Sequence, residues 1–192
     1  MYLYNDSNTI YKRDIREYYP QMWKFPIKYK IGNYLNNYII KKALEEIESN
    51  TCVKFQEDNL LNINTEGIFF ELSTRCMSYV GLEKSNERQT IELSYVCSSG
   101  TGYVLHEVGH ALGLLHEHTR TDRDKFVNID FSNIKKGLEI NFKIPNGTWY
   151  KNYSTHYDYG SVMSYRPNEV SISNWKQVTT SKLHPEYDRM TG

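Results

Sequence analysis

Regularly spaced apolar positions mark the first half of the chain. Apolar and charged residues alternate over 25–31, which predicts a half-buried strand. Residues 35–49 carry apolar side chains at helical spacing, with lysines and glutamates on the opposite side, and this predicts an amphipathic helix. Three further segments, 53–56, 67–72 and 90–95, are rich in β-branched and aromatic residues and predict additional strands.

A second long helix is predicted over about 100–114, with Ser99 as its N-terminal cap. The pattern becomes irregular beyond residue 120, where turns are marked by Pro145, Gly147, Gly160 and Pro167. We therefore expect an α+β fold of two lobes with a cleft between them. The lobe before His116 would hold a mixed sheet with two long helices, and the lobe after it would consist mainly of loops.

The run HEVGHALGLLH carries three histidines and a glutamate at the spacing of a zinc site. His106 and His110 are four residues apart, so on a helix they face the same side, one turn apart. Gly113 can end that helix in a left-handed conformation, which lets the chain turn back and present His116. Three neutral imidazoles leave a zinc coordination position open for water, as catalytic sites do. Glu107 lies on the neighbouring flank, within reach of such a water.

The downstream segment SVMSY makes the motif more specific. HExxH alone is a weak signal, because two histidines and a glutamate can also lie on the exposed side of an ordinary helix. The extension to HExxHxxGxxH, followed by a Met-turn, is the metzincin signature. Met163 alone would indicate only an adaptable core side chain. In this context we expect Met163 to lie beneath the metal.

The longer run HEVGHALGLLHEHTRTDRD resembles the astacin family of zinc endopeptidases, whose pattern is HExxHxxGxxHExxRxDRD. SVMSY is similar to that family's Met-turn, S-x-M-x-Y, and the segment 51–55 to its first cysteine segment. The resemblance covers roughly residues 14–192 and implies a metzincin-like catalytic domain with its active site in the cleft. It implies one Zn²⁺ per chain, bound by His106, His110 and His116, with Glu107 as general acid–base, Met163 as the Met-turn methionine and Tyr165 as a switchable further ligand.

The chemistry of such a site follows from charge. Zinc lowers the pKa of a bound water to about 7 and polarises a scissile carbonyl. Glu107 can accept the proton of that water and return it to the leaving amine. The phenol of Tyr165 can donate a hydrogen bond to the developing oxyanion. Without the resemblance, Tyr165 would be one of 17 tyrosines with no assigned role.

Three cysteines leave one without an obvious partner. The resemblance pairs Cys76 with Cys97, and Cys52 with a cysteine in a C-terminal helix that we expect to be missing here. The alternative is that all three are reduced, buried thiols. Disulfides favour an oxidising compartment, and glycosylation sequons at Asn5, Asn146 and Asn152 suit a secreted protein.

Composition narrows the range of partners. A chain of 192 residues can form one domain with a proper core. Its formal net charge of zero gives no electrostatic reason to expect nucleic-acid or membrane binding. The sequence holds no apolar run of about 18 residues for a membrane span, and residues 1–20 lack the apolar segment of a signal peptide. We expect protein or peptide substrates and no membrane insertion, and the sequence does not indicate an oligomeric state.

The dibasic pair Lys12-Arg13 suggests a processing site. Our hypothesis is that residues 1–13 are the remnant of a pro-segment and that 14–192 form the peptidase domain, with Asp14 as its first residue. In the family, the new amino group docks near the glutamate after the third histidine, here Glu117. The alternative is that Lys12 and Arg13 are ordinary solvated charges.

Two further readings of the zinc motif remain. One is a zinc-stabilised binding or adhesion module without turnover, which would need neither Glu107 nor Tyr165. The other is a zinc hydrolase of non-peptide substrates, which the long match to Asp124 argues against. Of the remaining histidines, His118 is expected to be exposed or structural, and His156 and His184 are expected to be structural.

Overall fold

The chain divides into two compact units. The structure is a computed structural model and describes residues 2–4, 10–12, 15–16, 21–145, 150–151, 155–183 and 185–189. Unit 1 comprises Met1–Ile10 and Tyr18–Leu114, and unit 2 comprises Tyr11–Glu17 and Leu115–Gly192. The main division therefore falls between Leu114 and Leu115, close to the boundary predicted between the lobes at His116. The predicted cleft between the lobes stays a prediction.

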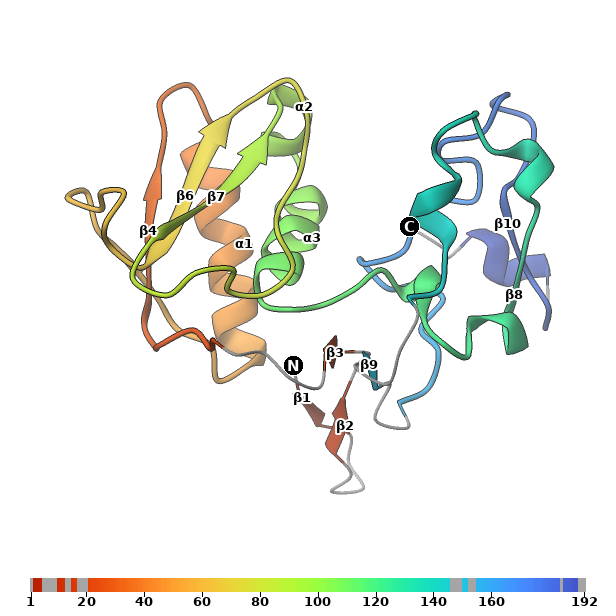
Figure 1. The fold of residues 1–192 in the computed structure, drawn as a ribbon, viewed down its shortest axis with the longest axis horizontal. Helices are drawn as coiled ribbons and strands as arrows, with labels where there is room; N and C mark the ends of the chain where they lie inside the picture. Colours follow the sequence, from red (N-terminus) through yellow and green to blue (C-terminus); the bar gives the residue numbers. More distant parts are fainter. Residues whose placement is uncertain are drawn as a thin grey trace. The chain divides into compact units, whose positions relative to one another are not determined.

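A four-stranded sheet forms the centre of unit 1, in the order β5-β4-β6-β7 (Figure 1). Its strands are β4 (Ile27–Ile31), β5 (Phe55–Glu57), β6 (Gly67–Leu72) and β7 (Arg88–Leu93). The three pairings between these strands are parallel. At the β7 edge of the sheet, Met77 forms an antiparallel bridge with Glu92. Parallel neighbours need a crossover between them, and helix α1 provides the one between β4 and β5.

Helix α1 (Asn37–Asn50) confirms the predicted amphipathic segment. Its N-terminal cap is Asn36, whose side-chain oxygen accepts a hydrogen bond from the backbone N–H of Ile39 (3.2 Å). The apolar stripe is buried and consists of Ile40, Ala43, Leu44 and Ile47. Figure 1 shows α1 beside α3 (Thr101–Ala111) on one face of the sheet, so both helices cover the core of unit 1.

The start of the second long helix differs from the prediction. A short helix, α2 (Tyr95–Ser98), precedes α3, and Ser94 caps it by accepting the backbone N–H of Cys97 (3.2 Å). Ser99 is the C-terminal cap of α2, and the extended residue Gly100 is the N-cap of α3 without a side-chain cap bond. The prediction of Ser99 as an N-cap was wrong because a separate turn of helix lies before Gly100.

A disulfide links α2 to the segment that borders β7. It joins Cys76 to Cys97, whose Cα atoms are 6.3 Å apart, and confirms the pairing that the family resemblance implied. Cys52 is free and exposed, so the reading of all three cysteines as reduced, buried thiols does not hold.

Unit 2 is rich in loops, as predicted. Its regular elements are short, and they are the 3-10 helices η1 (Glu117–Thr119), η2 (Arg123–Lys125), η3 (Phe131–Asn133), η4 (Glu139–Phe142) and η5 (Pro185–Arg189) and the antiparallel pairs β8 (Val127–Ile129) with β10 (Thr179–Ser181) and β3 (Ile15–Arg16) with β9 (Tyr150–Lys151). Two apolar clusters hold these elements, one around Tyr157 and one around Phe142. The remaining strands, β1 (Tyr2–Tyr4) and β2 (Ile10–Lys12), pair with each other.

Several predicted features lie outside the described residues, namely Asp14 and Arg13 at the proposed processing site, the sequons at Asn5, Asn146 and Asn152, the turn at Gly147, and His184. Within the described part of the chain, no helix has both the length and the apolar character needed to cross a bilayer.

Candidate metal centre

Helix α3 brings the first two predicted metal ligands together. His106 and His110 are one turn apart on the helix, and their Nε2 atoms lie 3.0 Å from each other. The two rings meet edge to face, with centroids 4.6 Å apart. Both imidazoles therefore point a nitrogen at the same place, as the spacing of the motif predicts.

The helix ends in a Schellman motif that redirects the chain toward His116. Gly113 has a φ of 101°, the left-handed conformation expected of it. Its N–H donates to the carbonyl of His110 (2.8 Å), and the N–H of Leu114 donates to the carbonyl of Gly109 (2.9 Å). These bonds satisfy carbonyls that the helix end would otherwise leave unpaired, so the glycine at this position fixes where the chain leaves α3.

The three histidines form a set of donors suited to zinc. His106, His110 and His116 each offer one ligand atom, and the three atoms lie within 4.8 Å of one another. His110 donates its Nδ1 hydrogen to the carbonyl oxygen of Leu114 (2.8 Å), which leaves its Nε2 for a metal. Burial, helped by the nearby His106, lowers the pKa of His110 to about 4. The imidazole is therefore neutral at physiological pH, the form that binds Zn²⁺.

Glu107 is a buried carboxyl group on the same helix. Its side chain is only 7% exposed. This burial raises its pKa to about 7, against the opposing effect of the Ser78 backbone N–H, which donates a hydrogen bond to it. A carboxyl with this pKa can accept and release a proton near neutral pH.

We expect Glu107 to make the stability of the zinc-free protein depend on pH. Its folded-state pKa of about 7 lies above the ordinary 4.5, so the folded chain binds the proton more tightly than the unfolded chain. This contribution to the free energy of unfolding is complete below about pH 4.5 and is lost as the pH rises through 7. Thermal unfolding in chelator from pH 4 to 8 should show the wild type losing stability relative to Glu107→Gln as the pH rises, because the opposite contribution of His110, whose pKa is lowered, is common to both proteins. Parallel curves for the two proteins would contradict it.

In unit 2, the Met-turn lies against the segment that carries the third histidine. The N–H of Glu117 donates to the carbonyl of Met163 (3.0 Å), and the Met163 side chain is buried. The ring of Tyr165 lies 4.7 Å from the ring of His116, measured between centroids. Unit 2 thus brings the segment of Met163 and Tyr165 against His116, which precedes these two residues by 47 and 49 positions.

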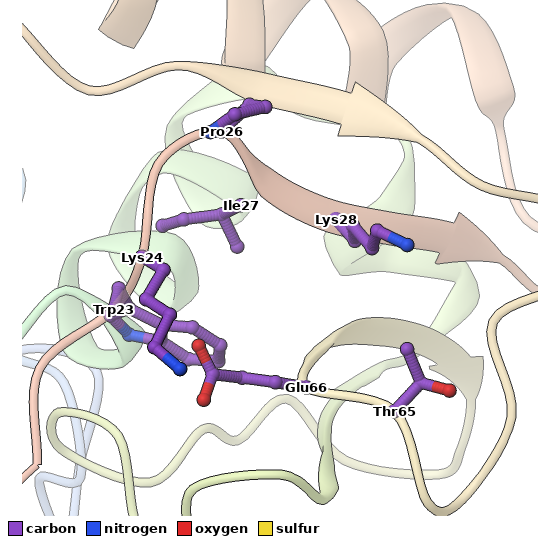
Figure 2. A pocket seen from close by; sticks show the side chains of 7 residues that line it. All are labelled: Trp23, Lys24, Pro26, Ile27, Lys28, Thr65 and Glu66. Atoms are coloured by element: carbon purple, nitrogen blue, oxygen red, sulfur yellow. The ribbon is translucent and has the colours of Figure 1, made fainter.

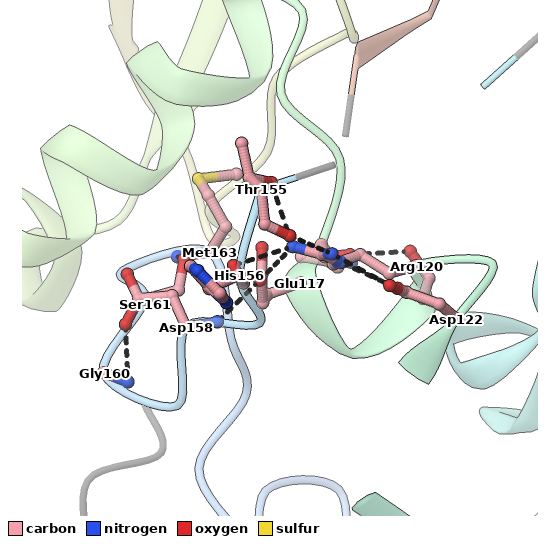
Figure 3. Close-up of polar contacts among 11 residues, drawn as sticks. Glu117, Arg120, Asp122, Thr155, His156, Asp158, Gly160, Ser161 and Met163 are labelled. Carbon is pink, nitrogen blue, oxygen red and sulfur yellow. Dashed lines mark hydrogen bonds and ion pairs between the residues drawn. The ribbon is translucent and has the colours of Figure 1, made fainter. Parts of the chain in front are cut away.

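A buried ionic network supports this segment (Figure 3). The guanidinium of Arg120 is fully buried and donates to Glu117 (3.0 Å) and to both carboxylate oxygens of Asp122 (2.9 and 3.1 Å). It also donates to the carbonyl oxygens of Thr155 (2.8 Å) and His156 (3.1 Å). Sequence reasoning placed Arg120 and Asp122 only as matches to a family pattern, because a charged run such as TRTDRD gives no sign of burial.

His118 is buried, with 1% of its surface exposed, so of the two predicted alternatives the structural one holds. His156 is exposed. The spacing of apolar residues does not predict this difference in burial between the two histidines. The burial of His118 follows from its tertiary contacts.

A pocket of about 220 Å³ lies at the start of β4 (Figure 2). It is lined by Trp23, Lys24, Pro26, Ile27, Lys28, Thr65 and Glu66. None of the three metal-site histidines lines it. One residue of its lining is bonded to α3: the indole N–H of Trp23 donates to the carbonyl of Ala111 at the end of that helix (2.7 Å).

An HExxH helix that ends at a left-handed glycine, a third histidine and a buried Met-turn together define a zinc metallopeptidase domain of the metzincin type. The chain belongs to the astacin family: residues 15–192 match the model of the Astacin peptidase family. It is therefore a metalloendopeptidase domain that uses zinc, with His106, His110 and His116 as the triad suited to bind the metal.

Named relatives agree with this assignment. The chain is 34% identical over 192 residues to astacin-like metalloprotease toxin 1 of Loxosceles intermedia, covering 95% of this chain and 69% of the toxin. It is 30% identical over 184 residues to zinc metalloproteinase nas-27 of Caenorhabditis elegans, covering 92% of this chain but 42% of that protein. The chain thus spans less than half of the length of nas-27.

Solved structures share the fold. High choriolytic enzyme 1, a hatching enzyme zinc-protease from Oryzias latipes, superposes with a TM-score of 0.72 at 27% identity, covering 85% of this chain and 86% of that one. Myroilysin superposes with a TM-score of 0.60 at 19% identity, covering 92% and 95% of the two chains. At that identity, the second likeness concerns the fold alone.

Proposed function

We propose that this protein is an extracellular zinc endopeptidase, in which His106, His110 and His116 bind the metal and Glu107 is the general acid–base. The observation that carries the proposal is the convergence of three imidazole nitrogens within 4.8 Å of one another. The buried Glu107 lies on α3, the helix that also carries His106 and His110. The disulfide between Cys76 and Cys97 supports an oxidising compartment such as the extracellular space.

In the proposed reaction, Glu107 moves the proton. Bound zinc would supply Lewis acidity toward a carbonyl and a water of lowered pKa. Glu107 takes the proton of the attacking water and delivers it to the amine that leaves. Its pKa of about 7, raised by burial, supports both steps, because neither form of the carboxyl is strongly favoured near neutral pH.

Tyr165 and Met163 have supporting parts in the proposal. Tyr165 is the further, switchable ligand whose phenol donates a hydrogen bond to the oxyanion of the transition state. Its ring already lies against that of His116, with centroids 4.7 Å apart. Met163 would provide the apolar floor of the zinc site: its side chain is buried, and its carbonyl accepts the N–H of Glu117 (3.0 Å).

We place the peptide substrate along the sheet edge near Met77. Met77 pairs with Glu92 of β7 through two backbone hydrogen bonds (2.9 and 3.0 Å), and the next residue, Ser78, donates its N–H to Glu107. An extended peptide that pairs with this edge would bring a bond close to the catalytic carboxyl. The Arg75 guanidinium and the Ser73 hydroxyl donate hydrogen bonds to the Glu92 carboxylate and lower its pKa to about 2. The ion pair between Arg75 and Glu92 at this edge therefore persists in weak acid.

Processing at the dibasic pair is part of the proposal. Residues 1–13 would be a pro-segment remnant and Asp14 the first residue of the peptidase domain, consistent with a family match that begins at residue 15. The new amino group would dock near Glu117, which is buried in unit 2. N-terminal sequencing of active secreted protein tests this, and a start far from residue 14 would refute it.

The alternative is a zinc-stabilised binding or adhesion module without turnover. Zinc removal and replacement separate the two. We expect chelated protein to lose hydrolysis of an unfolded protein substrate and to regain it in proportion to added Zn²⁺, up to one ion per chain. One bound zinc per chain without hydrolysis would favour the module, and hydrolysis that survives chelation would refute the zinc mechanism. A His116→Ala variant should fail to regain activity at the same zinc concentration.

A further inference from the structure

His118 is a buried imidazole that the zinc motif does not include. It lies in η1, two residues after His116, and is 1% exposed. Its Nε2 lies 3.2 Å from the carbonyl oxygen of Asn141, and its Nδ1 lies 3.3 Å from the backbone nitrogen of Tyr165. A carbonyl can only accept a hydrogen bond and a backbone N–H can only donate one. The neutral ring with its hydrogen on Nε2 satisfies both partners, and we assign this tautomer.

The ring of His118 also packs within a cluster of four rings: His116, His118, Phe142 and Tyr165. It is stacked on His116, with centroids 4.9 Å apart and planes 18° apart. Its centroid lies 4.6 Å from that of Tyr165 and 4.9 Å from that of Phe142. His118 therefore contacts the third zinc ligand of the motif and the proposed oxyanion donor at once.

A second buried arginine, Arg123, fixes the backbone around this cluster. Arg123 is buried and donates from one guanidinium nitrogen to the carbonyl of His118 (2.9 Å) and to the carbonyl of Phe142 (2.8 Å). Two chain segments that supply rings to the cluster are thus tied together. The imidazole of His118 is fixed by its two hydrogen bonds, by ring packing and by its own backbone.

We propose that His118 is a positioning residue for the reaction: it fixes the backbone of Tyr165 and the facing rings of His116 and Tyr165. The inference rests on the proposed function, because its effect on rate passes through Tyr165. A hydrogen bond to the Tyr165 N–H sets where that side chain begins, and the packed imidazole limits where the phenol can swing. Displacement of a catalytic group by about 1 Å can reduce the rate on the order of a hundredfold.

A double-mutant cycle tests this role against a merely structural one. His118→Phe keeps an aromatic ring and removes both hydrogen bonds. We expect it to lower kcat about tenfold or more while KM changes little. In a Tyr165→Phe background the same substitution should lower kcat less than about twofold, because the group it positions is gone. Equal fold losses in the two backgrounds would overturn the proposal, as would full activity of His118→Phe.

Tyr159→Phe is the matched control. Tyr159 is buried in the same unit, and its hydroxyl donates to the carbonyl of Phe126 (3.0 Å), so this variant also loses a buried hydrogen bond. It should reduce thermal stability while kcat stays at the wild-type value. A kcat loss in Tyr159→Phe equal to that in His118→Phe would show that general loosening of unit 2 explains the effect.

A spectroscopic measurement decides the question without turnover. Cobalt(II) can replace zinc in such a site, and its visible absorption reports the number and geometry of its ligands. We expect His118→Phe to change the cobalt spectrum of the resting protein, and Tyr159→Phe to leave it unchanged. An unchanged spectrum in His118→Phe would overturn the positioning role. A wild type that does not hydrolyse peptides would refute the proposed function instead, and the spectrum would then decide on His118 alone.

Discussion

Replacement of Glu107 by alanine should leave zinc binding intact and remove nearly all turnover. The three imidazoles that converge on the metal position do not depend on the carboxyl, so zinc content should stay at one ion per chain. The loss of a positioned acid–base group typically costs about 10²- to 10⁴-fold in rate, and we expect kcat to fall within this range. Steady-state kinetics on a peptide, with metal analysis of the same sample, measures both quantities.

Two companion variants make this result specific. Tyr165→Phe should also retain zinc and lose less, about 10²-fold, because it removes a single hydrogen bond to the oxyanion. Glu45→Ala, which removes an exposed glutamate from α1, should behave as wild type. Zinc-loaded Glu107→Ala with wild-type kcat would refute the assignment of Glu107.

Arg120→Leu should cause the largest loss of stability. The Arg120 side chain is fully buried and pairs with Glu117, which is 3% exposed. Without the guanidinium, the Glu117 carboxylate is left buried without its ionic partner, and breaking such pairs typically costs about 3–5 kcal/mol in free energy of unfolding. We expect the midpoint of thermal unfolding to fall by about 10 °C, measured by circular dichroism on the zinc-loaded protein.

The control for this variant is another arginine that pairs bidentately with a carboxylate. Arg75 binds both carboxylate oxygens of Glu92 (2.8 Å each), but its side chain is 63% exposed. Solvent screens an exposed pair, so Arg75→Leu should change the unfolding midpoint little. Equal shifts for the two variants would show that burial does not account for the effect of Arg120.

Local patterns predicted the elements that position the first two histidines. The apolar spacing of α1 and the i, i+4 spacing of His106 and His110 are properties of a single helix, and Gly113 marks its end through its own conformational freedom. The predicted N-cap at Ser99 was wrong because a short helix, α2, precedes α3. Ser94 caps the start of α2, Ser99 ends it, and Gly100 is the N-cap of α3.

Contacts between distant segments could not be predicted in this way. The parallel pairing of β6 with β4 and β7 joins strands that local patterns do not order. The burial of Arg120 depends on Thr155, 35 positions away, and the environment of His118 depends on Tyr165, 47 positions away. Polar residues in irregular segments have no periodicity that reveals whether they face water or the interior.

Cleavage of a mixed peptide library by the zinc-loaded protein, followed by mass spectrometry, tests the central claim most directly. Wild type and Glu107→Ala would be compared at equal zinc content, with and without chelator. We predict that wild type alone cleaves internal peptide bonds and that chelation stops it. An uncleaved library with one zinc bound per wild-type chain, or identical cleavage by Glu107→Ala, would contradict the assignment of this protein as a zinc endopeptidase that uses Glu107.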